Sequence, residues 1–236
     1  MGRRELNEKT SWEDSYGVIT YTEDALTLEA ERGPKEMILL CKKVTSLLTD
    51  WETLDQERRT NKRKASYAHA LVRRRDVQVD QLITQIHNDV LMVCKLDRKA
   101  PLFTRLFPDP LSSVVRLSLE SELPTLRELA LKLAEPETPE SLRKTYAKQV
   151  TALAEQGQQA IHLREEAFAM TGRTSARIVS WKEKANTVLQ GIEGALLQMS
   201  AEQNFGSDWV DAFFPTIERK KSREKSNARD SSHQQT

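Results

Sequence analysis

Hydrophobic residues recur in steps of seven along the first half of the chain, in two columns that lie three or four residues apart. Such spacing is typical of a helix packed lengthwise on a partner helix, whereas the period of two that a strand requires never persists. The pattern predicts a first long helix over residues 34–98, and proline and glycine are absent from Lys35 to Ala100. The first column is Met37, Val44, Trp51, Arg58, Ala65, Val72, Val79, Ile86 and Val93. The second column is Leu40, Leu47, Leu54, Asn61, Ala68, Arg75 and Leu82.

The hydrophobic columns weaken over residues 58–64, where the run is basic and polar. Two arrangements fit this interruption: one unbroken helix, or two helices that turn near residues 60–61. A turn normally recruits Gly, Pro or Asp, and only Asn61 is present here. We therefore favour the unbroken helix and keep the turn as the alternative.

A proline-rich apolar turn over residues 99–110 separates this helix from the helices predicted to return over residues 110–203. Asp109 is the expected N-cap, with Pro110 at the first helical position, because proline is tolerated there. Bends are expected at residue 124, which is proline, and at residues 135–139, where Thr138 is a second expected N-cap. A further break at Gly172 is the alternative to one continuous last helix.

These helices predict an all-α fold, an elongated antiparallel helical hairpin or coiled-coil-like bundle with very long helices. If both arms rise equally from one tight turn, facing residues have numbers that sum to about 208. This register brings the basic residues 73–75 opposite the acidic bend at residues 135–140. We therefore expect Arg74 to lie within ~10 Å of that bend, where exposed charge pairs help to set register.

The two ends of the chain differ from its middle. Residues 1–33 are expected to pack on the helices, with Thr22 capping a short helix that runs through Glu31. Residues beyond 172 are expected to pack against residues 8–34 and to thicken that end. The N-terminal segment contains an apolar, β-prone cluster too short for a sheet, namely Trp12, Tyr16, Val18, Ile19 and Tyr21. Residues 204–215 predict a short aromatic helix, and residues 216–236 predict a disordered basic tail.

Composition narrows the class of protein further. Hydrophobic residues make up 38% and charged residues 30%, so the core is thin relative to the surface and a slender bundle is favoured. The two cysteines form neither a Cys-x-x-Cys motif nor a disulfide framework, which favours a reducing compartment. The start lacks the apolar region of a signal peptide, and no strictly apolar run is longer than Met37–Cys41. We expect a cytoplasmic protein that does not span a membrane.

Motifs that carry catalysis or bind cofactors are absent from the sequence. It contains no His-Glu-x-x-His, no Glu-x-x-His, no glycine-rich phosphate loop and no Gly-x-Ser-x-Gly elbow. Adjacent carboxylates such as Glu165 and Glu166 are interpreted as a solvated helix face. We expect no enzyme activity, no cofactor, no metal site and no small-molecule substrate.

Two groups of residues are candidates for binding a macromolecular partner. Aromatic residues dominate interface hot spots, although they equally well close the open end of a bundle. The aromatic candidates are Phe205, Trp209, Phe213 and Phe214. Basic clusters are candidates for contacts with nucleic acid or an acidic partner, although helical spacing spreads them around the helix. The basic candidates are Arg58, Arg59, Lys62, Arg63, Lys64, Arg73, Arg74, Arg75, Lys220 and Lys221.

The sequence therefore favours a non-catalytic helical interaction or structural protein, a scaffold or assembly component that acts through protein–protein contacts or self-association. The alternative is a nucleic-acid-associated protein that uses residues 58–75 and the basic tail. The net charge of +1 does not discriminate between the two.

Overall fold

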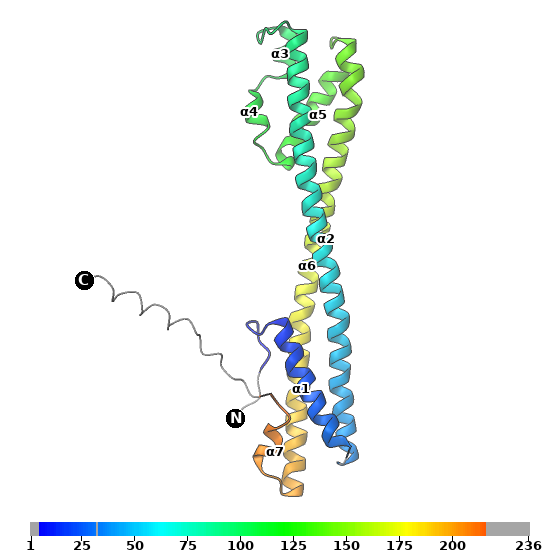
Figure 1. The fold of residues 1–236 in the computed structure, drawn as a ribbon, viewed down its shortest axis with the longest axis vertical. Helices are drawn as coiled ribbons and strands as arrows, with labels where there is room; N and C mark the ends of the chain where they lie inside the picture. The colour runs from blue at the N-terminus through cyan, green and yellow to red at the C-terminus, as the bar shows by residue number, and fades with distance from the viewer. Residues whose placement is uncertain (1–4, 32, 216–236) are drawn as a thin grey trace, which may run out of the picture. The chain divides into compact units, whose positions relative to one another are not determined.

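The described part of the chain, residues 5–31 and 33–215 of a computed structural model, consists of helices and connecting segments without a strand (Figure 1). The all-α class and the two very long helices predicted from the sequence are confirmed. None of the described helices has a stretch long and apolar enough to cross a membrane. The elements are α1 (Trp12–Ala30), α2 (Lys35–Val93), α3 (Pro101–Leu106), α4 (Leu111–Val114), α5 (Leu119–Ala134), α6 (Glu140–Gln203) and α7 (Ser207–Asp211).

Helices α2 and α6 pack antiparallel. The amide nitrogen of Asn61 donates to the hydroxyl of Thr174 at 2.9 Å, and the hydroxyl of Tyr146 donates to the carboxylate of Asp89. A step of 28 residues along α2 is thus matched by a step of 28 residues back along α6. Helix α2 runs through Asn61 without a turn, and α6 runs through Gly172 without a break.

The chain forms two compact units, and both long helices contribute to each. Unit 1 comprises residues 1–53 and 178–236, and unit 2 comprises residues 54–177. Unit 1 is therefore built from the two ends of the chain, whereas unit 2 is one continuous segment.

A tryptophan cluster forms the centre of unit 1. The rings of Trp12 and Trp51 stack with their centroids 5.0 Å apart, and Trp181 lies edge-on to Trp12 at 5.1 Å. The indole nitrogen of Trp181 donates to the backbone oxygen of Leu47 at 3.2 Å, so this buried polar atom is satisfied. The cluster joins α1, α2 and α6.

The segment before α1 is attached to α6 by polar side chains. The side-chain amide of Asn186 accepts from the backbone nitrogen of Leu6 and donates to its backbone oxygen, both at 2.8 Å. The ammonium group of Lys182, which is buried, donates to the backbone oxygens of Asn7 and Thr10 at 3.1 and 2.6 Å. These bonds satisfy backbone groups of a segment that lies outside the helices.

The core of unit 2 is formed by α2, α5 and α6, with α3 and the segment around Val114 packed on it. Helix α5 runs antiparallel to α6, since Arg127 donates to Gln158 and Arg164 pairs with Glu120. A Cβ atom at position 157 would lie 2.8 Å from a methyl group of Leu123, so the glycine at this position permits the close approach of α5.

The register predicted for the hairpin is wrong. Glu135 and Glu137 of the acidic bend pair with Arg105, not with Arg74, and Arg105 also donates to the hydroxyl of Thr138 at 2.7 Å. The prediction joined residues 110–134 to the returning arm. In the structure α5 doubles back, so that α6 alone returns along α2. The numbers of facing residues sum to 235, where the prediction was about 208.

The N-terminal segment is helical where a β-prone cluster was expected. Helix α1 begins at Trp12, and the hydroxyl of its N-cap Ser11 accepts from the backbone nitrogen of Asp14. Thr22 therefore lies inside the helix and does not cap it; its hydroxyl donates to the backbone oxygen of Val18 at 3.1 Å. Burial of one face of this segment outweighs its β propensity.

The N-caps predicted at Asp109 and Thr138 are both wrong by one residue. Pro110 is the N-cap of α4, and the backbone oxygen of Pro139 accepts the first bond of α6, from Arg143 at 3.0 Å. The hydroxyl of Thr138 donates instead to the backbone oxygen of Lys132, near the end of α5. The fixed φ of proline is compatible with the extended backbone of an N-cap as well as with the first helical position.

The other helix ends also differ from prediction. The helix expected over residues 110–134 is interrupted, because α4 ends at Val114 and α5 begins after Ser118, with Pro124 inside it. The first long helix ends at Val93, not at residue 98. Lys95 and Leu96 have φ of 52° and 66°, and the backbone nitrogen of Leu96 donates to Leu91 at 2.8 Å, a helix-ending motif usually built on glycine.

Replacing Trp181 with alanine is expected to lower the free energy of unfolding by ~3–5 kcal/mol, because a cavity replaces a buried aromatic side chain. Denaturant unfolding monitored by circular dichroism measures the loss. The matched control is Val179→Ala on the same helix, whose side chain is 47% exposed and whose loss should stay within ~0.5 kcal/mol. Equal effects of the two substitutions would contradict a central role for the tryptophan cluster.

Candidate interaction surfaces

The aromatic element at residues 205–214 is divided between core and surface. Phe213 and Phe214 are buried, with exposed fractions of 4% and 8%, whereas Phe205 is 43% exposed and Trp209 is half-buried. The rings form a chain, with centroid distances of 4.9 Å from Phe205 to Trp209 and 5.0 Å from Trp209 to Phe213. Two of the four candidate side chains therefore contribute to the core of unit 1.

Backbone contacts fasten this element to α1 and α6. The hydroxyl of Tyr21 donates to the backbone oxygen of Ala212 at 3.2 Å. Ser200 accepts from the backbone nitrogen of Phe205 at 2.9 Å, and its hydroxyl donates to the backbone oxygen of Phe205 at 2.8 Å. The surface left for a partner is Phe205 with the open side of Trp209.

Phe213→Ala is expected to destabilise the protein by ~3–5 kcal/mol, because its ring is buried, whereas Phe205→Ala should cost under ~1 kcal/mol. Thermal unfolding of the two variants and the parent protein measures both. An unchanged melting temperature for Phe213→Ala would contradict the assignment of its ring to the core.

Most of the basic candidates on α2 are open to solvent. Lys62, Arg63, Lys64, Arg73 and Arg74 are exposed and form no ion pair within the described residues. Arg58 and Arg59 instead pair with Asp55 at 3.0 and 2.6 Å, and half-buried Arg75 donates to Gln78. Lys220 and Lys221, with the predicted disordered tail, lie outside the described residues.

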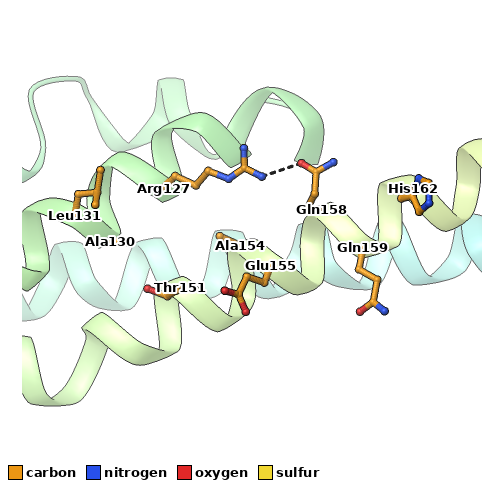
Figure 2. Close-up of a pocket in the computed structure, with 9 residues that line it drawn as sticks. All are labelled: Arg127, Ala130, Leu131, Thr151, Ala154, Glu155, Gln158, Gln159 and His162. Carbon is orange, nitrogen blue, oxygen red and sulfur yellow. Dashed lines mark hydrogen bonds between the residues drawn. The ribbon is translucent and has the colours of Figure 1, made fainter.

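A groove of about 720 Å³ runs between α5 and α6 of unit 2 (Figure 2). Small side chains, Ala130 and Ala154, lie between its two helices, and Leu131 at its edge is 72% exposed. The Arg127–Gln158 hydrogen bond of 2.9 Å crosses it, and Figure 2 shows these side chains reaching toward each other from α5 and α6. The groove offers an apolar strip with few charges, to which a helix or an extended segment could bind.

A second groove, of about 580 Å³, lies between α2 and α6 of unit 2. Ala68 and Ala167 are its buried members, and Tyr67, which is 66% exposed, stands at its α2 side. Its remaining lining residues are Thr60, Arg63, Lys64, Leu163, Glu166 and Met170. We call this surface the α2–α6 groove.

Three carboxyl groups meet between α2 and α5. Glu122 is fully buried, and its carboxyl group lies beside that of Asp80, with Asp76 nearby. The pKa of Glu122 is raised to about 8. Burial makes the largest contribution to this shift, followed by the neighbouring Asp80 and then by the charge of Asp76. Burial also raises the pKa of Asp80. Glu122 is therefore protonated at neutral pH.

The carboxyl cluster does not form a metal centre: among the described residues no group of three or more His, Cys, Asp or Glu side chains is arranged to hold an ion. Sequence reasoning missed the cluster, although a signal existed. Glu122 occupies a place in an otherwise apolar heptad column whose members are Leu119, Glu122, Leu126, Leu129 and Leu133, all of them buried.

Stability should fall as pH rises from about 4.5 to about 8, because the native carboxyl of Glu122 keeps its proton after the unfolded one has lost it. The limiting slope is about 1.4 kcal/mol per pH unit. Glu122→Gln removes this titration and should be more stable than the parent protein at pH 8. Urea unfolding at pH 5, 6, 7 and 8 compares the two.

A matched control is Glu128→Gln on the same helix, an exposed carboxylate that pairs with Lys132 at 2.7 Å. It should leave the pH slope of the parent protein in place. Parallel pH profiles for Glu122→Gln and the parent protein would contradict the raised pKa.

Comparison of the chain with protein-family models, with curated proteins and with solved structures finds no match.

Proposed function

We propose that this chain is a non-catalytic helical interaction or structural protein that acts through protein–protein contacts. The observation that carries the proposal is the coincidence of exposed large apolar side chains with grooves between helices. Leu131 borders the groove between α5 and α6, and Tyr67 borders the α2–α6 groove. Exposed apolar surface next to a concave strip is what a partner helix buries on binding.

The surroundings of these two side chains support this proposal. Single exposed apolar residues are ordinary on any protein surface, but these two lie where small residues, Ala130 and Ala68, leave room for another backbone to approach. The proposal includes self-association, because a second copy is itself a helical partner.

A second candidate function is association with nucleic acid. It is favoured by exposed lysine and arginine side chains of the basic segment 58–75 that form no ion pair with any described residue, namely Lys62, Arg63, Lys64, Arg73 and Arg74. Such binding would weaken steeply with salt, since each phosphate contact releases counterions. A protein contact through apolar grooves would depend little on salt.

A tagged pull-down of the full chain from native lysate, with and without nuclease, separates the two candidates. We expect a defined set of proteins to be retained after nuclease treatment and in about 0.5 M salt, a concentration that screens contacts with phosphate groups. Leu131→Glu should reduce that set if the groove of Figure 2 is used, and Leu28→Glu, the same change at an exposed leucine that does not line the groove, should not.

Partners that disappear with nuclease would overturn the protein-interaction proposal in favour of the second candidate. If untagged copies of the chain are retained with the tagged one, the contact is self-association. Sedimentation of the purified protein checks this result.

A further inference from the structure

We propose that the α2–α6 groove binds one amphipathic helix of a partner protein, with acidic residues along the flank that faces α2. The inference rests on the proposed function and names the kind of partner and its place of binding. Its basis is the juxtaposition, in one groove, of an apolar strip with unpaired basic side chains on one rim.

The strip is wide enough for a helix because the residues between the two long helices are small. Ala68 and Ala167 are buried at 2% and 5% exposure, and beside them Tyr67, Leu163 and Met170 present apolar surface to solvent. Elsewhere in unit 2 the large residues of the core are covered by α5, but the residues that line this groove come from α2 and α6 alone. A third helix here would complete the three-helix packing that α5 provides farther along α2.

The charges of the rim select the partner. Residues 58–75 of α2 contain eight lysine and arginine residues and no acidic residue. Arg63 and Lys64 line the groove and form no ion pair within the described residues. On the opposite rim the carboxylate of Glu166 contacts the ring of His162 at 3.2 Å, so the acidic residue of the groove lies on its α6 side. Acidic side chains over the α2 rim therefore give electrostatic complementarity.

Two other occupants fit less well. Residues 216–236 of this chain contain six basic and three acidic residues, and the like charge would be repelled by Arg63 and Lys64. A second copy packed through the same groove would bring the basic rims of two chains into the same contact. An acidic helix from a different protein meets neither obstacle.

The size of the groove sets the expected strength of binding. Its α2 side extends from Thr60 to Ala68, which is about 12 Å of helix or a little over two turns. A contact of this size is small, so this groove alone gives a reversible, transient complex. The partner helix should carry apolar residues at i, i+3 or i+4, and i+7, which insert beside Tyr67 and Met170.

Site-specific photo-crosslinking tests the proposal on the full chain. A benzophenone amino acid is placed at position 67, and in a matched control at position 69, where the exposed His69 does not line the groove. Each purified protein is irradiated in native lysate, and the crosslinked peptides are sequenced by mass spectrometry. We expect an adduct at position 67, weak or absent at position 69, with a segment that is net acidic and has the i, i+3 or i+4, i+7 apolar pattern.

Every other outcome overturns the proposal. These outcomes are an adduct with nucleic acid, with a second copy, with the tail of this chain or with a basic or non-helical segment, equal adducts at both positions, and no adduct. The pull-down distinguishes this failure from failure of the proposed function, because partners retained there without a crosslink at position 67 bind elsewhere on the chain.

A synthetic peptide with the sequence of the crosslinked segment then tests the role of charge. Lys64→Glu should weaken its binding by about tenfold or more in fluorescence anisotropy, and Lys62→Glu, an equal charge change at an exposed site outside the groove, should weaken it by less than about threefold. Equal weakening by the two variants would overturn the placement in the groove. Denaturant unfolding of both variants confirms that they remain folded.

Discussion

The antiparallel register of α2 against α6 is the constraint on which the other contacts depend. Over part of unit 2 the residues between these helices are alanines, which pack almost equally well after a shift along the helix. The buried amide of Asn61 removes this freedom, because only one register brings it to the hydroxyl of Thr174. A slipped pair would leave a buried polar group unsatisfied, at a cost of about 1–3 kcal/mol. The same polar residue that weakens the heptad pattern therefore specifies the pairing.

The third helix of unit 2 combines close packing with an electrostatic penalty. Gly157 lets α5 approach α6, and the leucines of α5 fill the core, but Glu122 brings a carboxyl group into the same layer, where no described cation pairs with it. The carboxyl group remains buried by keeping its proton. The free-energy cost of burying it offsets part of the stabilisation gained by packing α5 on the core. The position of α5 is thus linked to proton concentration near neutral pH, whereas the contact of Asn61 with Thr174 is not.

The sequence determines the helical class well and the three-dimensional pairing poorly. Heptad spacing without proline or glycine is a local property, and it predicted α2 across Asn61. The register depended on knowing which helix faces which, and residues 119–134 pair with α6 by doubling back, a choice that no local pattern encodes. The end of α2 gave no warning either, because Lys95 and Leu96 adopt a left-handed backbone that glycine usually marks.

The candidate surfaces, too, could be predicted from the sequence only in part. Aromatic residues in the segment 205–214 signalled importance, but burial alone separates Phe213 from Phe205, and burial depends on the neighbours that α1 and α6 supply. The α2–α6 groove joins residues a hundred positions apart, such as Tyr67 and Met170, so it exists only once the register is known. The exposed basic side chains of α2 were the one part of that surface visible in the sequence.

The attachment of Leu6 to Asn186 has a consequence for how the molecule assembles. These residues are 180 positions apart, and every contact that holds α1 on α6 closes a loop of comparable length. Unit 2 combines short loops, with only five residues between α5 and α6, and long ones, since Asn61 and Thr174 are 113 positions apart. The contacts of α1 with α6 therefore close longer loops than the contacts of unit 2, and long-range contacts of this kind slow folding. During synthesis α1 is made before α2 and α6, so its contacts with α6 form only after both long helices have been made.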